Sequence, residues 1–226
     1  MEERLKKGKE VLHSFDLLLS PSHDLLDRFP YPIKGLHHQL PLLRSIPWTP
    51  KPNGRIRFLY ASTIIPTKGL HLLLDAMEKL PNAELWVAGH HAMVDYWPNY
   101  FEEQKKRCES MDNIRFLGPY PHTKIPDLLA QSHCLVLPSL WPENSPIIIR
   151  EALAAGLHVI TSDQGGSKEL SPNIHTFSPQ KENELLEKMR SLTLFDSRNP
   201  PHPHQDIANH CQFLEKLYFN KKLALK

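Results

Sequence analysis

Two glutamates, Glu143 and Glu151, are separated by seven residues in the stretch WPENSPIIIREALAAG, and the second lies in an apolar run. A carboxylate in such a run needs hydroxyl groups, backbone amides or a cation as its partner. The residues three and four positions from Glu151 are two isoleucines and two alanines, so a helix offers it no local ion pair. We therefore expect Glu151 to bind paired hydroxyl groups of a ligand.

The start of this helix predicts where the two carboxylates lie. Ser145 is a good N-cap and Pro146 suits the first helical position, which leaves Glu143 in the loop just ahead. Glu151 then lies about 9 Å along the helix axis from the cap, so the two acids can face one cleft at different depths. Asn144 and Ser145 add short polar groups suited to a sugar, and the first amides of the helix offer an anion site.

A lysine in the stretch IIPTKGLHLLL supports an anionic ligand. Thr67 looks like an N-cap, which places Lys68 in the first helical turn, where the helix dipole disfavours a cation. A solvent-facing lysine explains this position, and so does a neighbouring phosphate. Because the anion site is predicted on the same sheet edge, we favour a diphosphate ligand. Gly165 and Gly166 follow a predicted strand and form either a tight turn or a close backbone approach to a ligand.

From residue 55 onward, short apolar runs alternate with helical patterns, which is typical of a parallel sheet wrapped by helices. We predict strands at 56–62, 84–89, 113–118, 133–139, 158–163 and 175–179, and helices at 70–80, 101–111, 125–132, 146–156 and 181–192. The fold class is therefore α/β, a doubly wound, Rossmann-like parallel sheet. Ligands bind such sheets at the carboxyl ends of the strands. We expect ligand loops after Ser62, Gly89, Gly118, Ser139 and Asp163.

The rest of the chain does not fit this sheet and defines the domain boundaries. Residues 1–50 contain a helix, a strand at 16–22, a helix at 22–29 and a proline-rich stretch, too little to enclose a core. We expect this segment to dock on the main domain at 51–200, on another copy or on a partner. RNPPHPH at 198–204 is a stiff break, and the last segment, 201–226, carries a separate helix at 206–223.

Composition excludes several classes of function. The chain has 27 Lys and Arg against 25 Asp and Glu, scattered along its length, so we expect no nucleic-acid partner. Three separated cysteines indicate a reducing, cytoplasmic setting, and the 14 histidines lack the spacing of metal ligands. The sequence shows no signal peptide, membrane span, GxGxxG or P-loop motif, which weighs against secretion, nicotinamide dehydrogenases and P-loop enzymes. The basic tail from Lys216 to Lys226 fits either an anionic surface or a solvated helix end.

Several of these motifs together resemble a known family. PENSPIIIREALAAGLHVITSDQGGSKEL is similar to the two-glutamate region of the retaining family 4 glycosyltransferases, and FLYASTIIPTKGLHLLLDAM to the first donor-domain strand and its Lys-Gly turn. The terminal helix resembles the one that crosses back to the amino-terminal domain in GT-B enzymes. The resemblance runs from about Asp16 to the end. It implies the carboxy-terminal half of a GT-B fold that binds a nucleotide-sugar donor and transfers its sugar with retention, without metal or cofactor.

By motif position, the resemblance implies binding roles for eight residues and no certain catalytic residue in this chain. From the sugar to the base they are Glu143, Asn144 and Ser145 for the donor sugar; Lys68 and Ile147 for the diphosphate; Glu151 for the ribose; and Pro119 and Tyr120 for the base. Two positions depart from the family. Thr63 stands where many members carry an arginine, and Pro146 lacks the amide of the usual glycine.

The larger departure is that most of an amino-terminal acceptor domain is absent from residues 1–50. The chain is then either a fragment or one partner of a split enzyme, and we expect it alone to bind nucleotide but to transfer sugar poorly or not at all. Two alternatives stay open: a catalytically silent module that binds a nucleotide sugar or a partner, and a nucleotide-sugar epimerase. Relatives that build polysaccharides or glycolipids suggest a cytoplasmic protein, with peripheral contact at the membrane face as an option.

Overall fold

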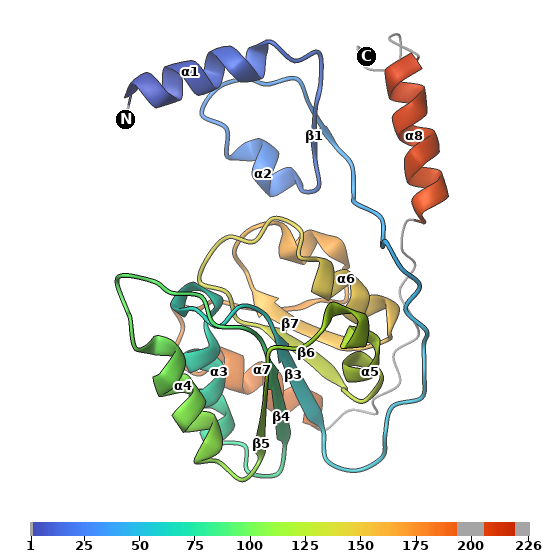
Figure 1. Cartoon of the computed structure of the whole chain (residues 1–226). Helices are drawn as coiled ribbons and strands as arrows, with labels where there is room; N and C mark the ends of the chain where they lie inside the picture. The colour runs from blue at the N-terminus through green and yellow to red at the C-terminus, as the bar shows by residue number, and fades with distance from the viewer. Residues whose placement is uncertain (1, 194–205, 220–226) are drawn as a thin grey trace. The chain divides into compact units, whose positions relative to one another are not determined.

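The structure is a computed structural model that describes residues 2–193 and 206–219 of the 226-residue chain (Figure 1). The chain divides into two compact units. One consists of Ile46–Pro203, and the other consists of Met1–Ser45 together with His204–Lys226. Each unit has its own sheet, with six strands in the larger unit and two in the smaller.

The larger unit contains a parallel sheet in the order β5-β4-β3-β6-β7-β8. Its strands are β3 (Arg57–Ala61), β4 (Glu84–Ala88), β5 (Ile114–Gly118), β6 (Cys134–Leu137), β7 (His158–Ser162) and β8 (His175–Phe177). Every neighbouring pair is parallel. The six predicted strands are therefore confirmed, and the α/β doubly wound sheet is the observed fold class.

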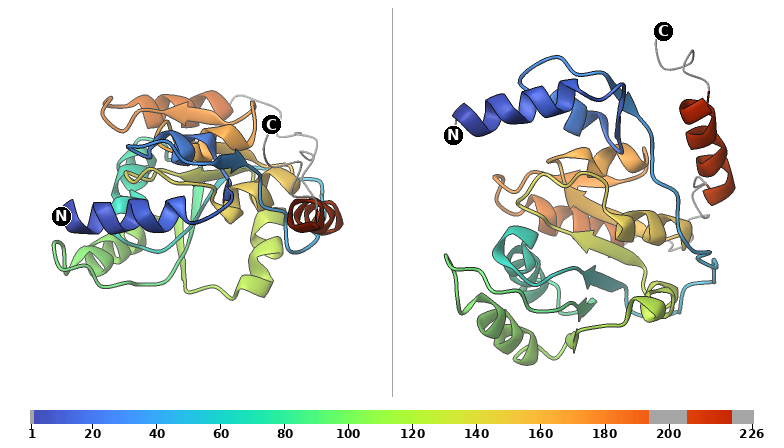
Figure 2. Two further views of the ribbon diagram at one scale, coloured as in Figure 1. Left: turned by 90° about the horizontal axis from the view of Figure 1, so that it is seen from above. Right: turned by 45° about the horizontal axis from the view of Figure 1, so that its top comes forward.

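Helices cover both faces of this sheet (Figures 1 and 2). The helices α3 (Leu70–Glu78), α4 (Tyr100–Glu109) and α7 (Glu184–Thr193) pack side by side, while α5 (Ile125–Ala130) packs with α6 (Ile147–Ala154). Short 3-10 turns lie at η1 (Pro66–Lys68), η2 (His122–Lys124) and η3 (Gly166–Leu170). Within residues 2–193 and 206–219, no helix has both the length and the apolar content needed to cross a membrane.

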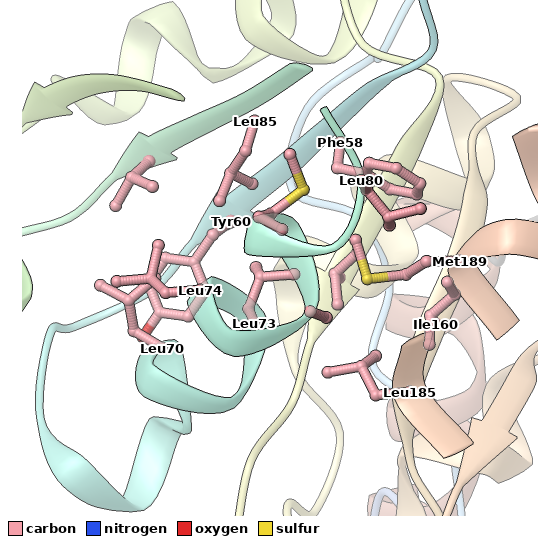
Figure 3. Close-up of a cluster of buried hydrophobic side chains, with 14 of the residues drawn as sticks. Phe58, Tyr60, Leu70, Leu73, Leu74, Leu80, Leu85, Ile160, Leu185 and Met189 are labelled. Atoms are coloured by element: carbon pink, nitrogen blue, oxygen red, sulfur yellow. The ribbon is translucent and has the colours of Figure 1, made fainter. Parts of the chain in front are cut away.

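The core follows from the period-two pattern of the strands. Phe58 and Tyr60 of β3 lie in one buried cluster with the apolar stripe of α3, whereas Leu59 between them is also fully buried but belongs to the opposite face. Figure 3 shows Leu73 and its neighbours on α3 packing toward these strand side chains. Fully burying a side chain of this size contributes about 1.5–3 kcal/mol. Both faces of the sheet are covered, so its strands read as continuous apolar runs.

The smaller unit is one strand-helix-strand motif with helices at both ends of the chain. It contains α1 (Glu2–His13), β1 (Leu18–Ser20), α2 (His23–Asp27), β2 (Gly35–His37) and α8 (Ile207–Phe219), and β1 pairs with β2 in parallel. The sequence did not predict β2, because three residues in a proline-rich stretch carry no readable alternation. The predicted break at 198–204 and the basic tail beyond residue 219 lie outside the described residues.

Two predicted helix starts are wrong. Helix α6 begins at Ile147 with Pro146 as an extended N-cap, and Ser145 makes no capping hydrogen bond. Helix α3 begins at Leu70, because Gly69 adopts a left-handed conformation (φ 71°) that separates it from the 3-10 turn η1. Thr67 therefore lies inside that turn and caps nothing. Lys68 ends the turn, outside the first turn of α3, so its predicted conflict with the dipole of that helix does not arise.

Candidate functional site

The loops at the carboxyl ends of the larger sheet meet at a topological switch point. β3 and β6 are neighbours, yet the chain leads from β3 to β4 on one side and from β6 to β7 on the other. Such a point opens a crevice that commonly binds ligands. The loop after β3 carries Lys68, and the loop after β6 carries Ser139 and Glu143.

Lys68 and Glu143 meet across this switch point. Lys68 Nζ forms an ion pair with Glu143 Oε1, and Ser139 Oγ donates a hydrogen bond of 2.7 Å to the same oxygen. The Lys68 and Glu143 side chains are 24% and 14% exposed, so water screens the pair only in part. A residue predicted to bind diphosphate is thus brought into contact with a residue predicted to bind a sugar. Nothing in their spacing along the chain signalled this pairing.

The glycine pair after β7 supports the backbone of Glu143. Gly165 forms a parallel β-bridge with Glu143, and the Gly166 amide donates to the Glu143 carbonyl at 2.6 Å. Gly165 has φ 75°, and a Cβ atom there would overlap the backbone of Glu143 and Pro142. The glycine pair therefore makes a close approach to the chain's own backbone at Glu143, a contact that neither interpretation of the sequence included.

Glu151 lies in a cavity beside this loop. It is only 2% exposed, and it lines a cavity of about 270 Å³ together with Ile147 and Ile148 from the first turn of α6. The lining also includes Pro119 and Tyr120 from the loop after β5. Four of the eight sequence-predicted residues, namely Ile147, Glu151, Pro119 and Tyr120, therefore share one cavity.

Asn144 and Ser145 lie outside that cavity lining, in the loop between β6 and α6, where both are half-buried. Ser145 Oγ accepts a hydrogen bond of 2.7 Å from Arg150 Nη2. Arg150 is 8% exposed, burial lowers the pKa of its guanidinium, and its Nε has no hydrogen-bond partner among the described residues. Sequence reasoning missed Arg150, and its one signal was a charge inside an apolar run.

Four further residues line the cavity, and the sequence indicated them only as part of the loops that follow the strands. Ser62 and Thr63 follow β3, His90 follows β4 and His122 follows β5, and all four line the cavity. Thr63 Oγ1 lies 3.4 Å from His90 Nε2. The signal available in the sequence was position alone, since each residue lies in a loop that follows a strand of a parallel sheet.

Tyr60 fixes the loop that carries Thr63. Its hydroxyl donates a hydrogen bond of 3.0 Å to the Thr63 carbonyl oxygen. Burial raises the pKa of Tyr60 well above its ordinary value, so the hydroxyl keeps its proton and remains a donor. The turn after β3 is thus tied to a side chain in the core.

The arrangement combines three chemical abilities. A buried carboxylate can accept hydrogen bonds from hydroxyl groups, the first amides of α6 can bind an anion, and the Lys68–Glu143 pair offers charge of both signs at the switch point. Within the described residues, no group of three or more His, Cys, Asp or Glu side chains is placed to hold a metal ion.

Several curated proteins that are similar to this chain are named as glycosyltransferases. YtcC of Bacillus subtilis (strain 168), which is named as a glycosyltransferase, is 29% identical over 191 residues, covering 73% of this chain and 47% of YtcC. The gpi3 subunit of phosphatidylinositol N-acetylglucosaminyltransferase from Schizosaccharomyces pombe is 25% identical over 137 residues, covering 58% of this chain and 29% of that protein. The chain thus spans less than half the length of these relatives.

Solved structures agree on the fold. The crystal structure of Anabaena Alr3699/HepE in complex with UDP and glucose superposes with a TM-score of 0.77 at 18% identity, covering 96% of this chain and 67% of that one. The six-stranded parallel sheet therefore matches GT-B glycosyltransferase structures. Residues 45–196, more than half of the chain, match the family described as "Glycosyl transferases group 1". The chain belongs to the group 1 glycosyltransferases.

Proposed function

We propose that the larger unit binds a nucleotide-sugar donor and that the chain serves a retaining glycosyltransferase of family 4. The observation that carries the proposal is the shared cavity: Glu151, the first turn of α6 and the Pro119–Tyr120 loop line one space at the carboxyl ends of parallel strands. A nucleotide combines paired hydroxyl groups, a planar base and a diphosphate. Each of these groups has a chemically matching wall in or beside this cavity.

The nucleoside would occupy the cavity itself. Glu151 would accept hydrogen bonds from both ribose hydroxyls, because an ionised carboxylate has two oxygens and donates none. Its position on α6, one turn after Ile147, would place the ribose next to the first amides of that helix. The base would lie against Pro119 and Tyr120, which line the same cavity.

The diphosphate and the sugar would extend toward the switch point. The Ile147 amide and the Lys68 ammonium would bind the diphosphate, and Glu143, with the backbone of Asn144 and Ser145, would bind hydroxyl groups of the sugar. The Lys68–Glu143 ion pair supports this assignment, because it holds both side chains at the switch point before a ligand arrives. As the bond to the sugar breaks, negative charge grows on the leaving diphosphate. Lys68 and the helix amides would stabilise that charge without a metal ion.

Acceptor binding would fall to groups outside the larger unit, supplied either elsewhere in a longer chain or by a partner. The short smaller unit and the larger size of the relatives support this division. We expect the purified chain to bind donor and to transfer sugar poorly. Robust transfer by the purified chain alone would show that the division is wrong.

Calorimetric titration with UDP, GDP and ADP, each repeated with a matching nucleotide sugar, tests the donor site. We expect one nucleotide to bind, and Glu151→Gln to weaken it about 10- to 100-fold, because the amide keeps one acceptor oxygen but removes the charge from the hydrogen bonds to the ribose. Glu109→Gln is the matched control, since Glu109 is an exposed acid at the end of α4 outside the cavity lining.

Thermal unfolding of each variant must show that the fold is retained. Absence of binding by all three nucleotides to the folded chain would refute the donor site and favour a silent module that binds a partner. Equal affinity of the Glu151 variant and the native chain would refute the role of this carboxylate.

A further inference from the structure

The cavity beside α6 adjoins the proposed diphosphate position at Ile147, yet few of its side chains can carry a positive charge. Within the part of the chain that the structure describes, its lining includes neither lysine nor arginine. Lys68 is outside the lining and is ion-paired with Glu143. The side chains in the lining that can carry a positive charge are His90 and His122, and its other titratable groups are Glu151 and Tyr120.

His90 occupies the central position among the strand ends that form the cavity. It follows β4, which lies between β5 and β3 in the sheet. The parallel ladder continues beyond the strand: the Ile64 amide donates to the His90 carbonyl at 2.9 Å, and Ile64 forms a β-bridge with His91. The backbone at His90 is therefore held by the sheet.

Alternation along this extended segment separates the two adjacent histidines. The His91 ring stacks on Phe101 of α4, with ring centroids 4.6 Å apart. The His90 imidazole lies in the cavity lining, with Nε2 3.4 Å from Thr63 Oγ1, and is exposed enough for a ligand to reach it. The sheet thus directs one imidazole of the pair to the cavity and the other to a hydrophobic neighbour.

We propose that His90 binds the diphosphate of the donor as an imidazolium and makes donor affinity depend on pH. This inference rests on the proposed function and adds a residue and a regulation to its site. An imidazolium donates a charge-assisted hydrogen bond to a phosphate oxygen, whereas a neutral imidazole gives a weaker one. Donor binding is therefore tightest where the imidazole is protonated, and it weakens as pH rises and the proton is lost.

The test measures the affinity of the nucleotide sugar whose nucleotide binds in the titrations above, from about pH 5.5 to about pH 8.5. A nucleotide sugar is the right probe because its two phosphates are both esterified and keep a constant charge over this range. We expect affinity to fall about tenfold across the range, the effect of one hydrogen bond to a charged group.

Four variants identify the residue. His90→Gln should lower affinity about tenfold at the acidic end, leave it unchanged at the basic end and abolish the pH dependence. His90→Lys should keep the affinity high and nearly constant, because lysine stays charged across the range. His122→Gln tests the other imidazole of the lining. His91→Gln is the matched control outside the lining and should retain the native pH profile.

The outcomes separate this inference from the donor site itself. Failure of every nucleotide to bind at any pH would overturn the proposed function and this inference with it. Binding with an affinity that does not change with pH would overturn only the inference. A pH dependence that survives His90→Gln and disappears in His122→Gln would also overturn it. Unfolding curves at each pH confirm that the variants stay folded.

Discussion

Replacing Gly165 with alanine tests the support of the Glu143 loop. Gly165 has φ 75° and ψ −166°, a backbone region that is essentially restricted to glycine and costs another residue about 1–3 kcal/mol. Its new Cβ would also overlap the backbone of Glu143 and Pro142, and backbone atoms cannot rotate away as a side chain can. Overpacking of this kind costs about 1–3 kcal/mol more. We therefore expect Gly165→Ala to lower the free energy of unfolding by about 2–6 kcal/mol.

Gly54→Ala is the control that separates backbone strain from overlap. Gly54 also has a positive φ, 117°, but a Cβ there would meet no heavy atom within 4 Å. Its substitution should cost only about 1–3 kcal/mol, since strain alone is introduced. The difference between the two variants then measures the contact between Gly165 and the Glu143 loop.

Urea unfolding followed by tryptophan fluorescence is the appropriate assay. All four tryptophans lie within Ile46–Pro203, so the signal reports the larger unit. With a slope of about 2 kcal/mol per molar urea, Gly165→Ala should unfold about 0.5–1.5 M earlier than Gly54→Ala. If Gly165→Ala retains its fold, donor affinity should also fall, because Glu143 is displaced. Equal midpoints for the two variants would refute the reasoning.

Two further predictions concern side chains buried away from the cavity. A thiol reagent at neutral pH should modify Cys211 alone in the native chain and all three cysteines in denaturant, and mass spectrometry measures the modification. The reason is that Cys108 and Cys134 are buried, and burial raises the pKa of Cys108 to about 12. The His133 imidazole accepts from the Arg57 amide at 2.9 Å, its other nitrogen lies 2.8 Å from the Pro52 carbonyl, and burial lowers its pKa. The unfolded chain therefore takes up a proton at His133 first, and the free energy of unfolding should fall as pH drops below about 6.5. His133→Gln should make the free energy of unfolding depend less steeply on pH. An unchanged pH dependence in this variant would contradict the prediction.

Much of the larger unit was readable from the sequence because each strand is short, apolar and followed by a helical stripe. All six strands and five helices of this unit lie within the predicted segments or within a residue or two of them. Leu73 and its neighbours on α3 show why. Apolar side chains that recur every three or four residues form one stripe of a helix, and this stripe is buried against the sheet. The smaller unit was harder, because β2 has only three residues.

The candidate site was readable in part. Glu151 was predicted as a binding residue because a carboxylate inside an apolar run needs a partner, and the structure places it in the lining of a cavity together with Tyr120. The helix starts at Ser145 and Thr67 were misplaced, since a cap depends on whether the side chain is engaged elsewhere. Arg150 engages Ser145, and no local rule predicts that contact.

The sequence alone determined the kind of sheet, the loops at the carboxyl ends of its strands and the residue types available there, because these follow from local periodicity and from the order of the strands. Only the tertiary structure decided which of those residues touch. Lys68 pairs with Glu143 across the switch point, Gly165 supports that glutamate, and His90 enters the cavity while His91 turns away. These contacts join segments far apart in the chain, and their geometry arises when the strands align in one sheet.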